Sequence, residues 1–196
     1  MRDPRSIPGE TKAQREARDR DRAIQLTRCG VASPVVRPEV VGDRPRLTHE
    51  LVDAESYWFP PNAQQPGGLE LDSGDPRTMQ QATYRHGQLW FAHSTNCEVK
   101  GSKEMLSCVR VTGLTPEGED GPAIDFQATL GKKNEFMFWP GAIVTEDGDV
   151  VVATLRSGTN RFLETAVFGM RGGAGRFEEI ITLSRMERAP RFGKAR

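Results

Sequence analysis

Two stretches decide the fold: RHGQLWFAHSTN (Arg85–Asn96) and EDGDVVVATLRSG (Glu146–Gly158). Each contains a polar turn with a glycine, then an apolar run and a polar stop. A glycine beside Asp or His between two apolar runs is typical of a tight β-hairpin turn, because glycine readily adopts the positive φ that such turns need. Each stretch therefore predicts a hairpin, and their similarity predicts one structural unit used twice.

The same pattern continues on both sides of these stretches. Short apolar runs alternate with glycine-containing turns such as EVKGSKE, LTPEGEDG, SGTNR and RGGAG, and no apolar stripe of helical period lies in this region. An antiparallel all-β protein is therefore expected. Strands are predicted at residues 79–84, 88–95, 105–112, 122–129, 136–144, 149–156, 163–170 and 176–183.

The eight predicted strands fall into two sets of four. Four strands in roughly 55–60 residues is the size of one blade of a β-propeller. The sets align along their second strands, where the matched positions are Gly87 with Gly148, Leu89 with Val150, Phe91 with Val152 and Ala92 with Ala153.

Three segments carry a resemblance to a known family: LDSGDPRTMQQATYRHGQLWFAHSTN, SCVRV and FWPGAIVTEDGDVVVATLRSG. Over about residues 64–185 the chain resembles bacterial β-propeller proteins of the sialidase-like, BNR-repeat kind. That resemblance implies about two antiparallel four-stranded propeller-like blades, at 79–129 and 136–183 within residues 73–185, and hence an incomplete propeller. The features that match the family's hairpin pattern are Trp139, Pro140, Ala142, Ile143, Asp147, Gly148 and Ser157.

The chain also departs from that family. The Asp-box, Ser-x-Asp-x-Gly-x-Thr-Trp, is absent, and Tyr57 and Tyr84 are the only tyrosines. Sialidases need three arginines for the substrate carboxylate and a Tyr–Glu pair for attack, and no such constellation can be assigned, so no catalytic residue is predicted. The expected function is a non-catalytic module that binds a glycan or a protein. The alternatives are a fragment of a sialidase-like glycoside hydrolase and a scaffold whose strand edges pair with another chain.

Five residues are candidates for ligand binding. Trp139, before a proline, could lie at the mouth of a propeller funnel and stack on a sugar ring. The arginines could line that funnel, although salt-bridged arginines at strand ends are commoner. For His93, a half-buried histidine with its hydrogen bonds satisfied is likewise the commoner case. The candidates are Trp139, Arg85, Arg110, Arg156 and His93, with Arg161 as a further funnel arginine. LDSGDPR is expected to be a turn in which Asp72 and Asp75 make side-chain-to-backbone hydrogen bonds. Asp75, Asp125 and Glu135 are acidic residues near strand ends.

Metal and cofactor binding are not expected. TEDGDV could offer Glu146, Asp147 and Asp149 to calcium, but it lacks the distal Glu of a calcium loop, and a hairpin turn explains it better. The histidines His49, His86 and His93 are not at zinc-ligand spacing. Cys97 and Cys108 flank EVKGSKEMLS, so they are either two half-buried thiols or a disulfide across a hairpin, while Cys29 has no obvious partner.

Composition bounds the partners and the ends of the chain. Lys+Arg and Asp+Glu both number 27 in 196 residues, so no global field recruits nucleic acid, and no apolar run is long enough to span a membrane. We expect a disordered or weakly helical charged tail at 1–30, a Pro-rich extended segment at 31–72 and a basic tail at 186–196. The N-terminus lacks the pattern of a signal peptide, so an extracytoplasmic location would require a truncated start. Two blades leave apolar faces open, and self-association or further blades would be needed to close them.

Overall fold

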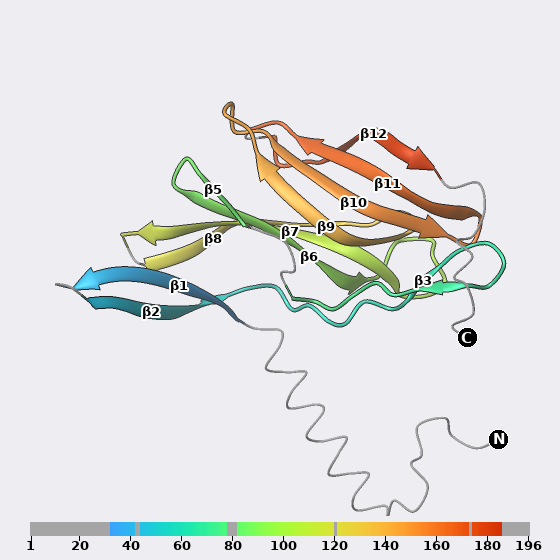
Figure 1. Cartoon of the computed structure of the whole chain (residues 1–196). Coiled ribbons are helices and arrows are strands. Elements are labelled where there is room, and N and C mark those ends of the chain that lie inside the picture. Colours follow the sequence, from blue (N-terminus) through green and yellow to red (C-terminus); the bar gives the residue numbers. More distant parts are fainter. Residues whose placement is uncertain (1–31, 42–43, 78–81, 120, 173, 186–196) are drawn as a thin grey trace, which may run out of the picture.

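The computed structural model describes residues 32–41, 44–77, 82–119, 121–172 and 174–185, and every regular element in these ranges is a strand. Two four-stranded antiparallel sheets lie one above the other, and a separate hairpin lies beside one of them (Figure 1). The all-β, antiparallel prediction is therefore confirmed. No helix among the described residues is long and apolar enough to cross a bilayer.

The first sheet has the order β5-β6-β7-β8, and the second has the order β12-β11-β10-β9. Each is a simple meander, since neighbours in the sheet follow one another along the chain. The strands are β5 (Thr83–Arg85), β6 (Gln88–Cys97), β7 (Leu106–Gly118), β8 (Gly121–Leu130), β9 (Phe136–Val144), β10 (Val150–Gly158), β11 (Arg161–Met170) and β12 (Glu178–Arg185). All eight predicted strands have a counterpart, and β7 runs further than expected because it pairs with β8 as far as Gly118.

Two short sheets precede these strands. β1 (Ala32–Val41) and β2 (Arg44–Asp53) form an antiparallel hairpin, and β3 (Ala63–Gln64) pairs with β4 (Glu70–Leu71). These four strands lie within residues 31–72, and β2 approaches β8. The tails predicted at 1–30 and 186–196, together with Cys29, lie outside the described residues.

The main core lies between the two large sheets. Buried apolar side chains from β6 and β7 pack against those of β9, β10 and β11, and Phe126 of β8 contacts both Trp90 and Phe177. Trp90 fits because Gly113 lies directly opposite on β7, where a Cβ would approach the indole to 2.8 Å. The core members are Trp90, Ala92, Val109, Val111, Met137, Ala142, Val144, Val150, Val152, Ala166, Phe168 and Met170.

The two sheets stack in the same orientation, front to back. On β6, Trp90 faces the second sheet, and Leu89 faces the other way, against Val52 and Leu114. On β10, Val150 faces the first sheet, so the next residue, Val151, points away from it because side chains alternate along a strand. The aligned residues of the two repeats, Leu89 and Val150, therefore face the same direction.

Residues 52–58, which we call the cover segment, lie across the far face of the first sheet. The backbone of Trp58 is hydrogen-bonded to β6: its N donates to the Thr95 side-chain Oγ1, and its O accepts from Asn96 N. Val52 is buried against Leu114 of β7. The first sheet is therefore covered on both faces. The second sheet is covered by the first on one face, and its other face is covered at one end, where Phe138 and Leu155 pack with Ala63 of β3.

Candidate ligand-binding site

A bulge in β9 turns Trp139 out of the core. The pairing runs from Gly141–Ala153 to Phe138–Leu155, so Trp139 and Pro140 together oppose the single residue Thr154. Trp139 takes a φ of 53°, which is uncommon for a large side chain, and bulges commonly re-aim side chains at functional sites. This local irregularity breaks the in–out alternation and leaves the indole 41% exposed.

The indole is held in one orientation. The Trp139 backbone N donates to Ser94 Oγ at 3.1 Å, and Nε1 donates to the carbonyl of Asp72 at 3.0 Å. Gly74, at a φ of 74°, lies so close that a Cβ there would be 3.5 Å from the ring. An exposed aromatic fixed at both its backbone and its ring nitrogen presents its surface with little rotamer entropy to lose on binding.

A charged pair lies on the same loop as Gly74. Asp72 Oδ1 accepts from Gly74 N, and Asp75 Oδ1 accepts from Arg77 N at 2.9 Å, so both aspartates shape the turn as the sequence predicts. The Arg77 side chain also donates from Nε to Asp75 Oδ2 at 2.8 Å. That hydrogen bond lowers the pKa of Asp75.

The loop and the bulge enclose a shallow crevice of about 10 Å³. Such a volume holds at most about one water molecule, so the site is a surface rather than a deep pocket. The hydroxyl of Ser73 is buried here without a hydrogen-bond partner among the described residues. The lining residues are Ser73, Gly74, Asp75, Arg77, Ala92, His93, Ser94, Trp139 and Pro140.

The crevice brings together two of the five candidates, Trp139 and His93, but the His93 ring makes internal contacts. It is 5% exposed, its Nδ1 donates to the carbonyl of Ser94 at 3.0 Å, and it makes an edge contact with Tyr57. Burial lowers the pKa of His93, the hydrogen bond to Ser94 opposes this, and nearby Arg110 lowers it further. His93 is therefore a neutral imidazole that helps hold the cover segment in place.

Arg110 is also engaged inside the protein. Its Nη1 donates to the carbonyls of Glu55 and Ser56 at 3.0 and 2.9 Å, and its Nε and Nη2 donate to Thr129 Oγ1. Nη2 also lies 3.3 Å from a carboxylate oxygen of Glu55. Arg110 therefore anchors the cover segment, and its side chain is 10% exposed.

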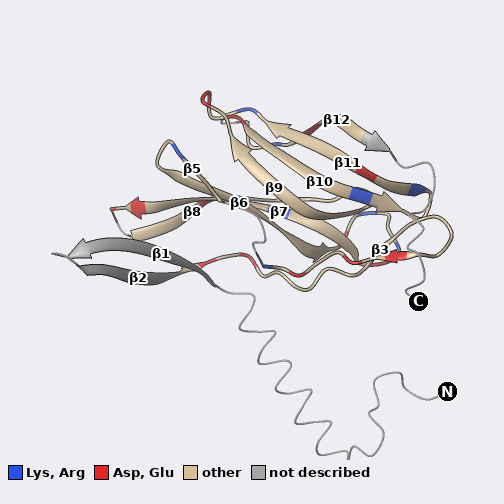
Figure 2. Cartoon of the chain, viewed as in Figure 1, with Lys and Arg blue, Asp and Glu red and all other residues tan. Residues whose placement is uncertain are grey.

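Arg156 is at the centre of a buried arginine–glutamate network. Its side chain is 2% exposed, Nε donates to Glu164 Oε1 at 2.8 Å, and Nη1 lies 2.9 Å from Glu179 and 3.4 Å from Glu135. Burial alone would lower the pKa of Arg156, but hydrogen bonds to Glu179 and Glu164 raise it on balance. Figure 2 shows basic and acidic positions side by side on β10 and β11. The network contains Arg156, Arg161, Lys132, Glu135, Glu164 and Glu179, three charges of each sign.

The remaining candidates lie apart from the crevice. Arg85 is on the exposed side of β5, 3.9 Å from Glu146 across to the next hairpin. Among the acidic residues, Glu135 belongs to the network, while Asp125 accepts hydrogen bonds from Gln88 and Thr115. Each of these carboxylates therefore has a structural partner of its own.

The turn at residues 145–149 is a hairpin turn, as its Asp-Gly predicts. Thr145 N donates to the Asp149 carbonyl, and Asp149 Oδ1 accepts from Gly172 N at 2.9 Å. Within the described ranges, no three His, Cys, Asp or Glu side chains are grouped so that they could hold a metal ion.

Cys97 and Cys108 are joined by a disulfide, with their Cα atoms 5.9 Å apart. They lie on adjacent strands, β6 and β7, and Cys97 pairs with Leu106 two residues before Cys108. Of the two states left open by the sequence, the structure shows the disulfide.

No protein-family model, curated protein or solved structure matches this chain. The site is therefore known from its own geometry. Sequence reasoning assigned LDSGDPR only to a turn and overlooked Arg77 and Ser73 as neighbours of Trp139. The signal was present in that segment, because an Asx turn with a glycine at positive φ is a place where another side chain can approach closely.

Proposed function

We propose that the protein is a non-catalytic binding module that recognises a glycan at Trp139, on a scaffold of two propeller-like blades. The observation that carries the proposal is the fixed, 41% exposed indole beside the Asp75–Arg77 pair. The apolar face of a sugar ring stacks on an indole, whose π face is electron-rich. Sugar hydroxyls donate hydrogen bonds to a carboxylate and accept them from a guanidinium. The shallow crevice suits a ligand that lies on the surface.

Front-to-back stacking supports the propeller-like scaffold. A propeller repeats one four-stranded meander about an axis, so equivalent residues of successive blades face the same way. Leu89 with Val150, and Trp90 with Val151, follow this rule. The turn glycines before these strands, Gly87 and Gly148, have φ values of 77° and 82°.

Trp139→Asn tests the site. Asn tolerates the left-handed backbone better than most residues, so this variant removes the indole with little strain. We expect wild-type protein to bind at least one glycan on an immobilised panel, with titration calorimetry for any hit, and the variant to lose at least about tenfold in affinity, roughly 1.4 kcal/mol.

Trp58→Ala is the matched control, because that indole is 40% exposed and lies on the cover segment. It should bind as wild type does. Loss of binding in both variants, or in neither, would contradict the assignment of Trp139. Hydrolysis of a bound glycan by the wild type would overturn the non-catalytic part of the proposal, and a panel without hits would overturn the glycan as ligand.

A further inference from the structure

The second sheet has an apolar face turned away from the first sheet. Ile143 and Val151 lie opposite each other on β9 and β10, and Ile180 covers Gly169 next to them, where a Cβ would approach Ile180 Cδ1 to 2.4 Å. The next row has Ala153, Val167 and Ile181 in register. We call this the outer face; its members are Ile143, Val151, Ala153, Val167, Ile180 and Ile181.

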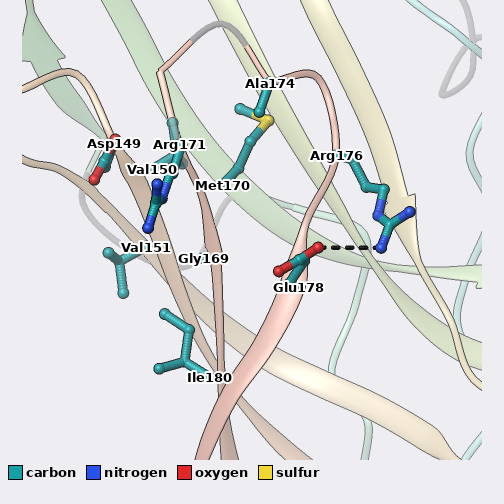
Figure 3. Close-up of a pocket in the computed structure, with 10 residues that line it drawn as sticks. All are labelled: Asp149, Val150, Val151, Gly169, Met170, Arg171, Ala174, Arg176, Glu178 and Ile180. Atoms are coloured by element: carbon teal, nitrogen blue, oxygen red, sulfur yellow. Dashed lines mark hydrogen bonds and ion pairs between the residues drawn. The ribbon is translucent and has the colours of Figure 1, made fainter.

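The outer face is exposed and hollowed. Ile143, Ile180 and Ile181 are 59%, 61% and 49% exposed. Two open hollows flank Val151, one of about 680 Å³ that reaches Ile180, and one of about 590 Å³ that reaches Ile143 and Tyr84. Figure 3 shows Ile180 and Val151 in the first hollow, with Arg176 paired to Glu178 at its rim. Soluble monomers seldom keep large contiguous apolar patches in water.

The outer face corresponds to a face of the first sheet that is buried. Trp90 corresponds to Val151 in the repeat, and Trp90 is buried against the second sheet. The outer face is thus the counterpart, in the second repeat, of the first-sheet face that packs against the second sheet. The opposite face of the stack is closed by the cover segment, which Arg110 and Val52 hold in place. Of the faces of the two large sheets, the outer face is therefore the one with an open apolar area, between Ile143 and Ile181.

The composition of residues 1–31 and 186–196 does not suit an apolar face, because both segments contain few large apolar side chains and many charges. A second copy of the chain does supply a matching apolar surface.

We propose that the outer face binds the outer face of a second copy, forming a closed two-fold dimer. A face that pairs with its own copy allows an isologous contact and stops further growth, whereas head-to-tail stacking would need the face that the cover segment occupies. The rim charges agree with a two-fold axis along the strands. Such an axis brings the Arg176–Glu178 pair on the β12 side over the Arg85–Glu146 pair on the β9 side, so that opposite charges can meet.

The expected dimer is a weak one. Strands about 4.8 Å apart and about 3.3 Å per residue give the open part of this four-stranded face a flat area of roughly 300 Å². Counted on both copies, this is roughly 600 Å², less than the roughly 1,000 Å² that stable specific interfaces exceed, so the association is expected to be weak and reversible. This inference does not depend on glycan binding at Trp139, which lies on a different surface.

Sedimentation velocity of the full chain over a range of concentrations tests the proposal. We expect a reversible monomer–dimer equilibrium in the wild type, and a shift of at least about tenfold toward monomer in Ile143→Glu/Ile180→Glu, because each dimer would bury four unpaired carboxylates. Leu69→Glu is the matched control: Leu69 is 47% exposed and is not part of the outer face. It should dimerise as wild type does.

Far-UV circular dichroism of each variant distinguishes lost association from lost folding, and the exposed positions chosen should leave the fold intact. A wild type that stays monomeric at all concentrations overturns the proposal. So does a dimer that persists in the double variant, or open-ended assembly that grows with concentration. Dimers that respond to the double variant and not to Leu69→Glu support it.

Discussion

Each large sheet has a buried arginine, and the two arginines are stabilised in different ways. Arg110 of the first sheet donates to backbone carbonyls of the cover segment and pairs with the exposed Glu55 carboxylate, and so fixes one piece of chain to another. Arg156 of the second sheet is surrounded by three carboxylates within its own sheet and the turn before it. Arg110 thus links the first sheet to the cover segment, whereas the charge of Arg156 is neutralised within the second sheet.

Neither arginine is free to bind a ligand. Guanidinium groups are expensive to bury without partners, and these two use most of their donors internally. Removing the two arginines should lower the free energy of unfolding by unequal amounts. A carboxylate left without a partner in a protein interior is far less tolerable than a carbonyl left without one.

The largest effect is expected from Arg156→Ala. This variant leaves Glu164, whose side chain is 1% exposed, with the partly exposed Arg161 as its cation, and should lower the free energy of unfolding by about 3–5 kcal/mol in urea titrations. Arg176→Ala breaks an exposed pair with 80% and 72% exposed side chains and should cost less than about 1 kcal/mol. Equal costs for the two variants would mean that the network does not stabilise the second sheet.

The disulfide gives the next largest effect and belongs to the first sheet alone. Replacing both Cys97 and Cys108 by Ala should lower the free energy of unfolding by about 3 kcal/mol, since the bond closes a short loop in the unfolded chain. Reductant should destabilise the wild type by a similar amount and leave the double variant unchanged. Cys29→Ala is the control. Three titratable thiols in the denatured, unreduced wild type would show that the bond does not form.

Arg110→Met should have a smaller effect than Arg156→Ala. It removes the donors to the carbonyls of Glu55 and Ser56, and the Glu55 carboxylate that also loses its partner is 67% exposed to water, so we expect a loss of about 2 kcal/mol. Hydrogen exchange should also become faster at the amides of residues 52–58, and not in β10 or β11. If exchange accelerates evenly over both sheets, Arg110 does not act through the cover segment.

The smallest effect concerns pH. Burial lowers the pKa of His93 in the folded state below its ordinary value of 6.5, so the unfolded chain takes up a proton first. The stability contributed by neutral His93 is complete above that ordinary value and is lost as the pH falls through it toward the lower folded pKa, with a slope of at most about 1.4 kcal/mol per pH unit.

His93→Gln should remove that slope from the stability curve measured by urea unfolding between about pH 7 and pH 5. The slope that remains should come from carboxylates such as Glu179, whose pKa is lowered by the hydrogen bond from Arg156, and should steepen toward lower pH. An unchanged curve in His93→Gln would mean that the buried imidazole does not control stability in this range.

The sequence by itself determined the eight strands and their antiparallel order. Glycine beside Asp, Asn or His fixes where hairpin turns can form, and alternating apolar residues fix which strands are half-buried; both are local properties. The equivalence of Gly87 with Gly148 was likewise visible in the letters, and their similar φ values agree with it.

The tertiary structure decided which candidate residues meet. Arg110 and Arg156 look alike in the sequence, and only the packing of residues 52–58, Glu164 and Glu179 determines that both are internal. Trp139 becomes exposed because a bulge opposite Thr154 breaks strand alternation. Its neighbours Gly74 and Arg77 lie on a loop that is distant from it in the sequence. Contacts of this kind depend on how separate elements pack, and local sequence does not encode that choice.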